Sequence, residues 1–211
     1  MLRANGFKWI DIYSLVEKIC KIQNPSTEVI KVKYFTAPII SRFSIHGQKS
    51  NESQNAYHRA LKQLRNDEIE IIEGFHTVER GTPPVYKKPI DINERVQVWD
   101  FEEKQTDVNI AMHMYRDSLS EVLSQQVLMS NDSDLESALK FIKEDRPHIE
   151  VGLIIPVPKP EDPDNARPVT KYLDNYSDWT RKYILDEECQ ESLLPDKVPT
   201  RKKPIIKPDY W

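Results

Sequence analysis

The sequence predicts an α/β protein in which a mostly parallel central sheet is covered by helices on both faces. Two observations support this class. Segments with strand-like and helix-like patterns alternate several times along the 211 residues, as expected for a parallel sheet with crossover helices. The composition, 38% hydrophobic and 30% charged, is that of one domain with its own buried core. No run of about 18 apolar residues occurs, so no membrane span is predicted.

The first half of the chain supplies two helices and three strands in this prediction. Apolar side chains recur at three- and four-residue steps from Trp9 to Ile19 and predict an amphipathic helix. A β-branched and aromatic run closed by Pro38 predicts a buried strand. The Pro-rich, charged stretch 76–95 indicates an excursion or hairpin off the core. The expected elements are helices at about 9–21 and 53–65 and strands at 29–35, 68–75 and 96–101.

The second half continues the alternation and then becomes rich in proline. Residues 157–168 are acidic and Pro-rich, which predicts a loop or linker. We therefore divide the chain into a domain over 1–156 and a C-terminal extension over 157–211, whose final Tyr210 and Trp211 suggest a tail that packs back on the body. The expected elements are helices at about 106–120, 133–145, 169–176 and 187–194 and strands at 125–131, 149–156 and 178–185.

Charge and cysteine content restrict the functional classes. Thirty Lys and Arg against thirty-four Asp and Glu give a net charge of −4, which argues against a protein that holds nucleic acid by bulk positive charge alone. Metal-assisted phosphate chemistry stays open, because a metal ion supplies positive charge locally. The first residues lack the apolar core of a secretory signal, and two isolated cysteines suit a reducing compartment. We therefore expect a cytoplasmic protein.

The densest chemical signal follows the strand expected at 125–131. Ser130, Asn131, Asp132, Ser133 and Asp134 lead directly from this strand into the next helix. Ligands of open α/β sheets bind outside the carboxyl ends of the strands, which places both carboxylates at the expected mouth. Such oxygen ligands suit Mg²⁺ or Mn²⁺. The alternative is structural, because a Ser followed three residues later by Glu is a capping box and acids in a first helical turn complement the helix dipole.

A further carboxylate is expected at the same edge of the sheet. Asp107 follows Thr106 at the start of the preceding helix, and in a doubly wound sheet that helix start lies near the carboxyl end of the neighbouring strand. Three carboxylates from two elements repel one another unless a cation lies among them. An Asp at a helix start is also a common cap.

These residues resemble the NYN domain, a branch of the PIN-like nucleases. The likeness rests on "KxTDVNIA" from Lys104 and on "VLMSNDSDLE" around Asp132, and it takes in "FKWIDI", "VKYFTA", "HMYRD" and the closing "LLPDKV…IIKPDYW". It covers nearly the whole chain, and "TDVNIA" and "SNDSD" in this order are its specific parts.

The resemblance implies a Rossmann-like, PIN-type three-layer α/β/α sandwich with a central, mostly parallel sheet and a metal-dependent ribonuclease site. The catalytic and metal-binding candidates carried over from it are Asp107, Asp132 and Asp134, with Mg²⁺ or Mn²⁺ as cofactor. Ser130 and Asn131 shape the loop, and Lys104 and Thr106 are candidates for substrate contact. Asp117 is a weaker match to a family acid. The implied partner is single-stranded or structured RNA, and a homodimer or a protein partner is compatible with the sequence.

The sequence departs from the family pattern at its start. The family opens with a central strand that ends in an Asp, whereas this chain begins about where that motif has just ended. Three functions are open: a metal-dependent ribonuclease, a degenerate member that binds RNA or a protein without cleavage, and, with less support, a phosphatase or sugar-nucleotide enzyme. For the ribonuclease, a set of basic residues is expected to follow the RNA backbone. They are His58, Arg59, Lys62, Arg65, Lys87, Lys88 and the run Arg201 to Lys203.

Overall fold

The computed structural model describes residues 6–162, 164 and 168–210. The helices are α1 Ile12–Gln23, α2 Gln48–Arg65, α3 Thr106–Ser118, α4 Glu136–Asp145, α5 Lys171–Asp174 and α6 Asp186–Glu191, with short 3-10 turns η1 Ser41–Phe43, η2 Asn66–Glu68 and η3 Ser133–Leu135. The strands are β1 Val32–Thr36, β2 Ile69–Glu73, β3 Phe75–Gly81, β4 Val98–Lys104, β5 Gln125–Met129, β6 Glu150–Ile154, β7 Trp179–Arg181, β8 Lys197–Val198 and β9 Ile205–Ile206. The mixed α/β class is confirmed.

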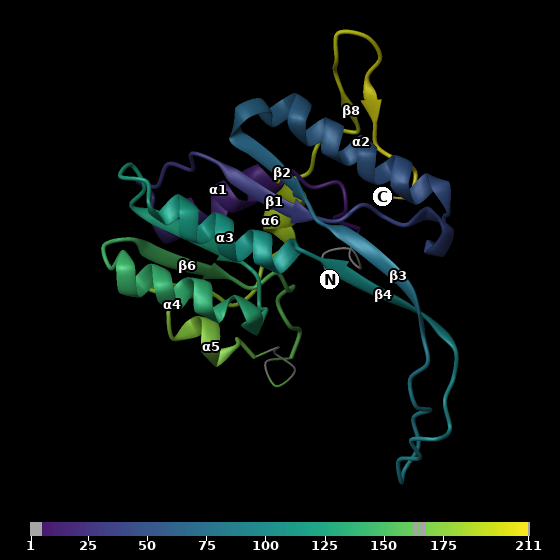
Figure 1. Ribbon diagram of the computed structural model, residues 1–211. Coiled ribbons are helices and arrows are strands. Elements are labelled where there is room, and N and C mark those ends of the chain that lie inside the picture. The colour runs from purple at the N-terminus through teal and green to yellow at the C-terminus, as the bar shows by residue number, and fades with distance from the viewer. Residues whose placement is uncertain (1–5, 163, 165–167, 211) are drawn as a thin grey trace.

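Two small parallel sheets form the body (Figure 1). In one, β1 pairs with β2; in the other, β5 pairs with β6 and β6 with β7. Among the described residues, β1 has no strand partner besides β2, and β5 has none besides β6. Among the described residues, β1 and β5 therefore each have one edge that pairs with no other strand.

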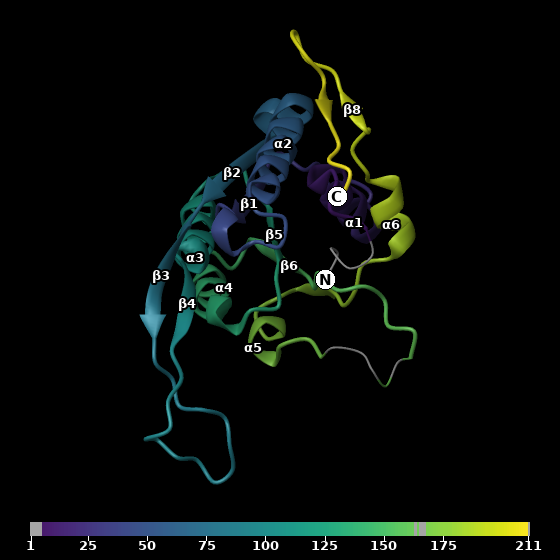
Figure 2. The same ribbon diagram turned by 90° about the vertical axis from the view of Figure 1, so that its right-hand side faces the viewer.

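Helices α1 and α3 connect the two sheets. Ile12 of α1 packs against the cluster over β1 and β2 and also against the cluster that contains Ile154 of β6. Helix α3 contacts β1 and also packs on α4 and η3, which belong to the other sheet. In Figure 2, α3 lies to the left of β1 and β5. The two sheets are thus held in one body by helices rather than by strand pairing.

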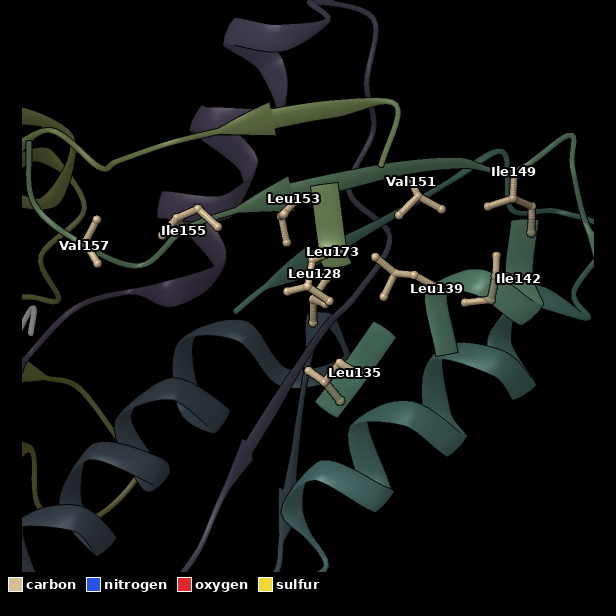
Figure 3. Packing of buried hydrophobic residues seen from close by; sticks show 10 residues of the cluster. All are labelled: Leu128, Leu135, Leu139, Ile142, Ile149, Val151, Leu153, Ile155, Val157 and Leu173. Carbon is tan, nitrogen blue, oxygen red and sulfur yellow. The ribbon is translucent and has the colours of Figure 1, made fainter. Parts of the chain in front are cut away.

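The largest apolar cluster lies between the β5–β6–β7 sheet and helices α4 and α5 (Figure 3). Leu139 and Ile142 of α4 and Leu153 of β6 are fully buried in it. Their spacing explains the helix, because positions 135, 139 and 142 lie on one face at the period of an α-helix. These are the elements expected at 133–145 and 149–156.

Several helices and strands begin or end at residues other than those predicted from the sequence. Helix α2 begins at Gln48 rather than 53, after Gly47, whose φ of 52° reverses the chain where a side chain would be strained. The strand expected to stop at Gly74 does so, but β3 starts at the next residue and forms an antiparallel ribbon with β4. This ribbon extends away from the body in Figure 1 and corresponds to the excursion expected at 76–95.

The C-terminal segment is integrated with the rest. Strand β7 extends the sheet of β5 and β6, and Ile184 and Leu194 are buried in two different clusters. The Tyr210 hydroxyl donates to the Lys49 carbonyl at 2.5 Å and accepts from the Ser53 hydroxyl at 2.8 Å. Trp211 lies outside the described residues.

Two further expectations concern the cysteines and the membrane. Cys20 and Cys189 are both free and buried, and burial raises the pKa of each thiol to about 11, so neither is a reactive thiolate at neutral pH. Within the described residues, no helix combines the length and the apolar character needed to cross a bilayer.

Candidate acidic site at the carboxyl end of β5

The loop after β5 is held by its own polar side chains. Asp132 caps η3, since its Oδ1 accepts the backbone N–H of Asp134 at 3.1 Å, and its own N–H donates to Ser130 Oγ at 3.1 Å. The capping alternative raised by the sequence is therefore real, with Asp132 rather than Ser133 as the cap. Both carboxylates remain exposed, so capping leaves oxygens of Asp132 and Asp134 accessible to a ligand.

Asn131 fixes this loop to the segment before α5. Its Oδ1 accepts the backbone N–H of Thr170 at 2.9 Å, its Nδ2 donates to the Pro168 carbonyl at 3.3 Å, and its carbonyl accepts from Thr170 Oγ1 at 3.1 Å. Asn131 thus ties the loop to Pro168 and Thr170. Both the oxygen and the nitrogen of its side-chain amide therefore form hydrogen bonds within the protein.

The second side of the site is the start of α3. Gln105, with φ of 71°, turns the chain from β4 into the helix, and Thr106 donates a short hydrogen bond to Glu103. Gly74 permits this turn to pack closely, because a Cβ at Gly74 would lie 2.5 Å from the Lys104 carbonyl oxygen and 2.6 Å from Thr106 Oγ1. The contact of β2 and β3 with the α3 start therefore determines where Asp107 lies.

The charges of the loop after β5 act on Asp107 at the start of α3. Partial burial and the negative charges of Asp132, Glu103 and Asp134 together raise the pKa of the Asp107 carboxyl. Helix α3 contacts η3, and the raised pKa of Asp107 agrees with Asp132 and Asp134 lying near enough for their charges to act on it. Glu103 is an additional member that was not predicted from the sequence, although it lies in the "EEK" stretch directly before the α3 cap.

These carboxylates are not arranged as a finished metal site. In the part of the chain that the structure describes, no three His, Cys, Asp or Glu side chains converge as ligands of one ion. The donor set nevertheless suits a hard divalent cation, because all four groups present oxygen atoms. Binding would require Asp107, Asp132 and Asp134 to move towards a common point, which their exposure permits.

Lys104 and Asp117 form ion pairs with residues outside this acidic site. Lys104 forms a short ion pair with Glu102 on its own strand. Asp117 lies at the opposite end of α3 from Asp107, and ten residues of helix span about 15 Å. Its Oδ2 pairs with Lys33 Nζ at 2.5 Å, and Lys33 Nζ also lies 3.2 Å from His113 Nδ1. Burial, followed by the charges of Lys33 and Arg116, lowers the pKa of His113.

The same strand end does not suit a dinucleotide cofactor. Such cofactors place their pyrophosphate on a glycine-rich turn at a helix N-terminus. The turn between β5 and α4 contains no glycine, and its Asp132 and Asp134 would repel phosphate. The site at this edge therefore suits a cation or a neutral polar group rather than a diphosphate.

At this level the chain is an α/β protein with parallel sheets and an acidic site at a strand end. No family model and no solved structure matches it. It is similar to 6-hydroxy-3-succinoylpyridine 3-monooxygenase HspA of Pseudomonas putida (strain DSM 28022 / S16), with 32% identity over 228 aligned residues that cover 100% of this chain and 70% of the relative. The chain belongs to the family of this monooxygenase.

The family membership corrects the function expected from the sequence. The relative is an enzyme, but it is named as a monooxygenase, which is an oxidoreductase. The expected metal-dependent ribonuclease activity, and with it the nuclease and hydrolase classes, is therefore wrong. The error has a physical origin, because carboxylates at the end of a parallel strand define a place in the fold and not one reaction. The resemblance to the NYN domain stays a prediction.

Proposed function

We propose that this chain is a monooxygenase that hydroxylates a small nitrogen heteroaromatic compound. The observation that supports this proposal is the 32% identity with 6-hydroxy-3-succinoylpyridine 3-monooxygenase across the whole chain. Since the match includes both the acidic strand end and the C-terminal segment, it is not limited to a shared accessory module.

The reaction determines what the site must provide. A monooxygenase inserts one atom of O₂ into the substrate and reduces the other to water, so each turnover consumes two electrons and two protons. The electrons come from an external two-electron donor, which we take to be of the reduced nicotinamide class, and they would reach O₂ through a redox group of the flavin class, because a reduced nicotinamide does not activate O₂ itself. The protein must bind the ring, orient it and move protons.

Asp107 is the best candidate for proton transfer in this chain. Its raised pKa, caused by partial burial and by the surrounding carboxylates, makes it a better proton acceptor than an ordinary Asp. We assign its carboxyl the hydrogen bond to the ring hydroxyl or ring N–H of the substrate. Asp132 and Asp134 would then act on Asp107 through their charge.

A divalent cation is the cofactor that suits this donor set best. The same carboxylates have this second candidate role: Mg²⁺ or Mn²⁺ would bind Asp107, Asp132 and Asp134 and relieve their mutual repulsion, and Asp107 would then be a metal ligand rather than the proton acceptor. The test is a thermal melt with and without each ion, using Asp132→Asn with Asp134→Asn as the variant. A rise in Tm that the variant loses supports the site, and an unchanged Tm in the parent protein rejects it.

The central experiment measures oxygen transfer directly. Purified protein is incubated under ¹⁸O₂ with 6-hydroxy-3-succinoylpyridine or a panel of hydroxypyridines, with NADH or NADPH as donor, and products are analysed by mass spectrometry. The Pseudomonas putida relative serves as the positive control. We expect a product carrying one ¹⁸O atom, whose formation falls at least tenfold in Asp107→Asn and is unchanged in Asp67→Asn, an exposed acid outside the site. If the relative forms product and this chain forms none, the proposal is rejected.

For the fold, we propose that the two parallel sheets are halves of one PIN-type sheet in an α/β/α sandwich. The supporting observation is that β1 and β5 each keep one open edge among the described residues, while α1 and α3 contact both halves. A further central strand, as the NYN resemblance implies, would pair with both edges. We also propose a cytoplasmic location, where Cys20 and Cys189 stay reduced.

A further inference from the structure

A hollow of about 590 Å³ opens between helix α2 and the hairpin formed by β8 and β9. Both strands contact α2, and in Figures 1 and 2 the hairpin rises beside this helix. The side chains that line the hollow are Arg59, Lys62, Gln63, Thr200, Lys202, Lys203 and Ile205. Four of these seven residues are cations.

Local structure explains why these residues meet. Arg59, Lys62 and Gln63 are three and four positions apart and share one face of α2, while Leu61 on another face is fully buried in the core. On the hairpin, Thr200 Oγ1 donates to the Lys203 carbonyl at 2.8 Å and accepts the Lys202 N–H at 3.2 Å. The turn is thereby shaped so that both lysines line the hollow.

The positive charge in the hollow is uncompensated by the protein. Within the described residues, neither Arg59 nor Lys62 forms an ion pair, and neither Lys202 nor Lys203 does. The whole chain nevertheless has a net charge of −4, so this concentration of cations is local. Lys62 in the last turn of α2 also complements the helix dipole, but the dipole does not account for Arg59 or for the hairpin lysines.

We propose that this hollow binds the phosphate groups of a small ligand of the nucleoside diphosphate class. Arg and Lys are the side chains that proteins use for phosphate oxygens, and the hydroxyl of Thr200 and the amide of Gln63 add neutral partners. The volume lies within the roughly 300–1,000 Å³ of small-molecule sites. Ile205 and the lysine stems provide an apolar surface for the rest of the ligand. The inference does not depend on the proposed monooxygenase activity.

A small ligand explains the hollow better than a long nucleic acid does. Nucleic-acid binding relies on a stripe of basic residues that follows many phosphates. Here the four cations converge on one hollow between two elements. The basic residues Lys87 and Lys88, which were also expected to follow the RNA backbone, lie in the distant ribbon, where Lys87 is paired with Asp91 at 3.3 Å and with Glu94.

The test is a calorimetric titration of the full chain with ADP, inorganic pyrophosphate and adenosine. We expect ADP and pyrophosphate to bind and adenosine to bind at least tenfold more weakly, since phosphate provides the recognition. Two variants, Lys202→Gln with Lys203→Gln and Arg59→Gln with Lys62→Gln, should each weaken ADP binding at least tenfold. The matched control, Lys31→Gln with Lys182→Gln, removes the same charge from two exposed, unpaired lysines outside the hollow and should change the Kd less than twofold.

Several results would overturn the proposal. They are an absence of ADP and pyrophosphate binding at millimolar concentration, an equal loss in the control variant, or equal affinity for adenosine and ADP. An RNA oligonucleotide that binds with affinity rising with its length, and that pyrophosphate does not displace, would assign the hollow to nucleic acid instead. Urea unfolding of each variant checks that it is folded. Backbone amide shifts of Thr200 and Gln63 on ADP addition provide a second readout in the parent protein, and unshifted amides count against the hollow.

Discussion

Gly152 is a position where one added methyl group tests the packing between β6 and β7. Gly152 and Trp179 are partners in the register of these parallel strands. A Cβ at Gly152 would lie 2.8 Å from Trp179 Cη2 and closer still to two other atoms of the indole ring. The ring is the rigid part of the side chain and Gly152 is buried, so the clash cannot be relieved by a small rotation. The indole must move away from the sheet.

The expected loss in the free energy of unfolding of Gly152→Ala follows from overpacking of the core. Forcing additional carbon into a packed core costs about 1–3 kcal/mol, and since the ring atoms meet the new methyl group head-on we expect Gly152→Ala to fall near the upper value, roughly 3 kcal/mol. The measurement is urea-induced unfolding followed by far-UV circular dichroism. For a domain of this size such a loss lowers Tm by roughly 6–12 °C.

A second substitution separates the clash from a general loss of strand stability. In a Trp179→Phe background the smaller ring leaves room for the methyl group, so the cost of Gly152→Ala should fall by at least 1 kcal/mol, a coupling typical of residues in contact. Equal costs in both backgrounds, or a cost below about 0.5 kcal/mol in the parent chain, within the range of ordinary surface changes, would refute the reasoning.

Three further predictions concern α1, the acidic site and the open sheet edges. Asp11 is buried, caps α1 and accepts from Arg65 Nη2 at 2.6 Å and Nε at 2.8 Å. Asp11→Ala should therefore cost about 2 kcal/mol in urea unfolding, because it removes the helix cap and leaves the half-buried guanidinium with Glu68, at 3.4 Å, as its ion-pair partner; a cost under 1 kcal/mol would contradict this. The pKa of Asp107 is raised in the folded state, so the protein loses stability as the pH rises from the pKa of this group in the unfolded chain to its pKa in the folded protein. Asp107→Asn should therefore raise the free energy of unfolding at pH 7 by no more than about 0.5 kcal/mol, and this gain should disappear at pH 3. A gain that persists at pH 3 would have another cause. Amides of β1 and β5 that face away from β2 and β6 should exchange hydrogen faster than their ladder-bonded neighbours, as NMR exchange rates can measure; uniform protection along both strands would mean that the open edges are covered.

Periodicity predicted the elements whose packing is local. The helix over 133–145 is found as η3 and α4, because its apolar spacing matches the buried face of Leu139 and Ile142. The start of α2 was missed, since Gly47 at positive φ and the polar residues that follow it do not signal a helix by hydrophobic pattern. The split between the two parallel sheets was also outside the reach of pattern analysis. Which strand edges remain open is decided by tertiary contacts of α1 and α3, not by local sequence.

For the candidate site, the position was predictable and the chemistry was not. Acids after β5 and at the start of α3 were expected to meet, because the carboxyl ends of parallel strands and the helix starts beside them share one edge. The charge coupling of Asp107 with Asp132 and Asp134 agrees with this. Glu103 was missed because the end of β4 was expected at residue 101, before this side chain. The ribonuclease inference went beyond placement and was wrong.

If the proposed monooxygenase function is correct, the acidic strand end and the basic hollow would meet different requirements of the reaction. Without a bound cation, the carboxylates of the turn after β5 repel phosphate, and the turn has no glycine cradle for the diphosphate of a nucleotide-type donor. The hollow between α2 and the β8–β9 hairpin has the opposite charge and no carboxylate among its lining residues. If the electron donor carries a diphosphate, this separation requires the nicotinamide end to reach the acidic site from elsewhere or electrons to be delivered by another carrier. Kinetics of the Lys202→Gln, Lys203→Gln variant distinguish these routes: a raised KM for NADH with unchanged kcat would place the donor in the hollow, and unchanged kinetics with lost ADP binding would assign the hollow to a different ligand.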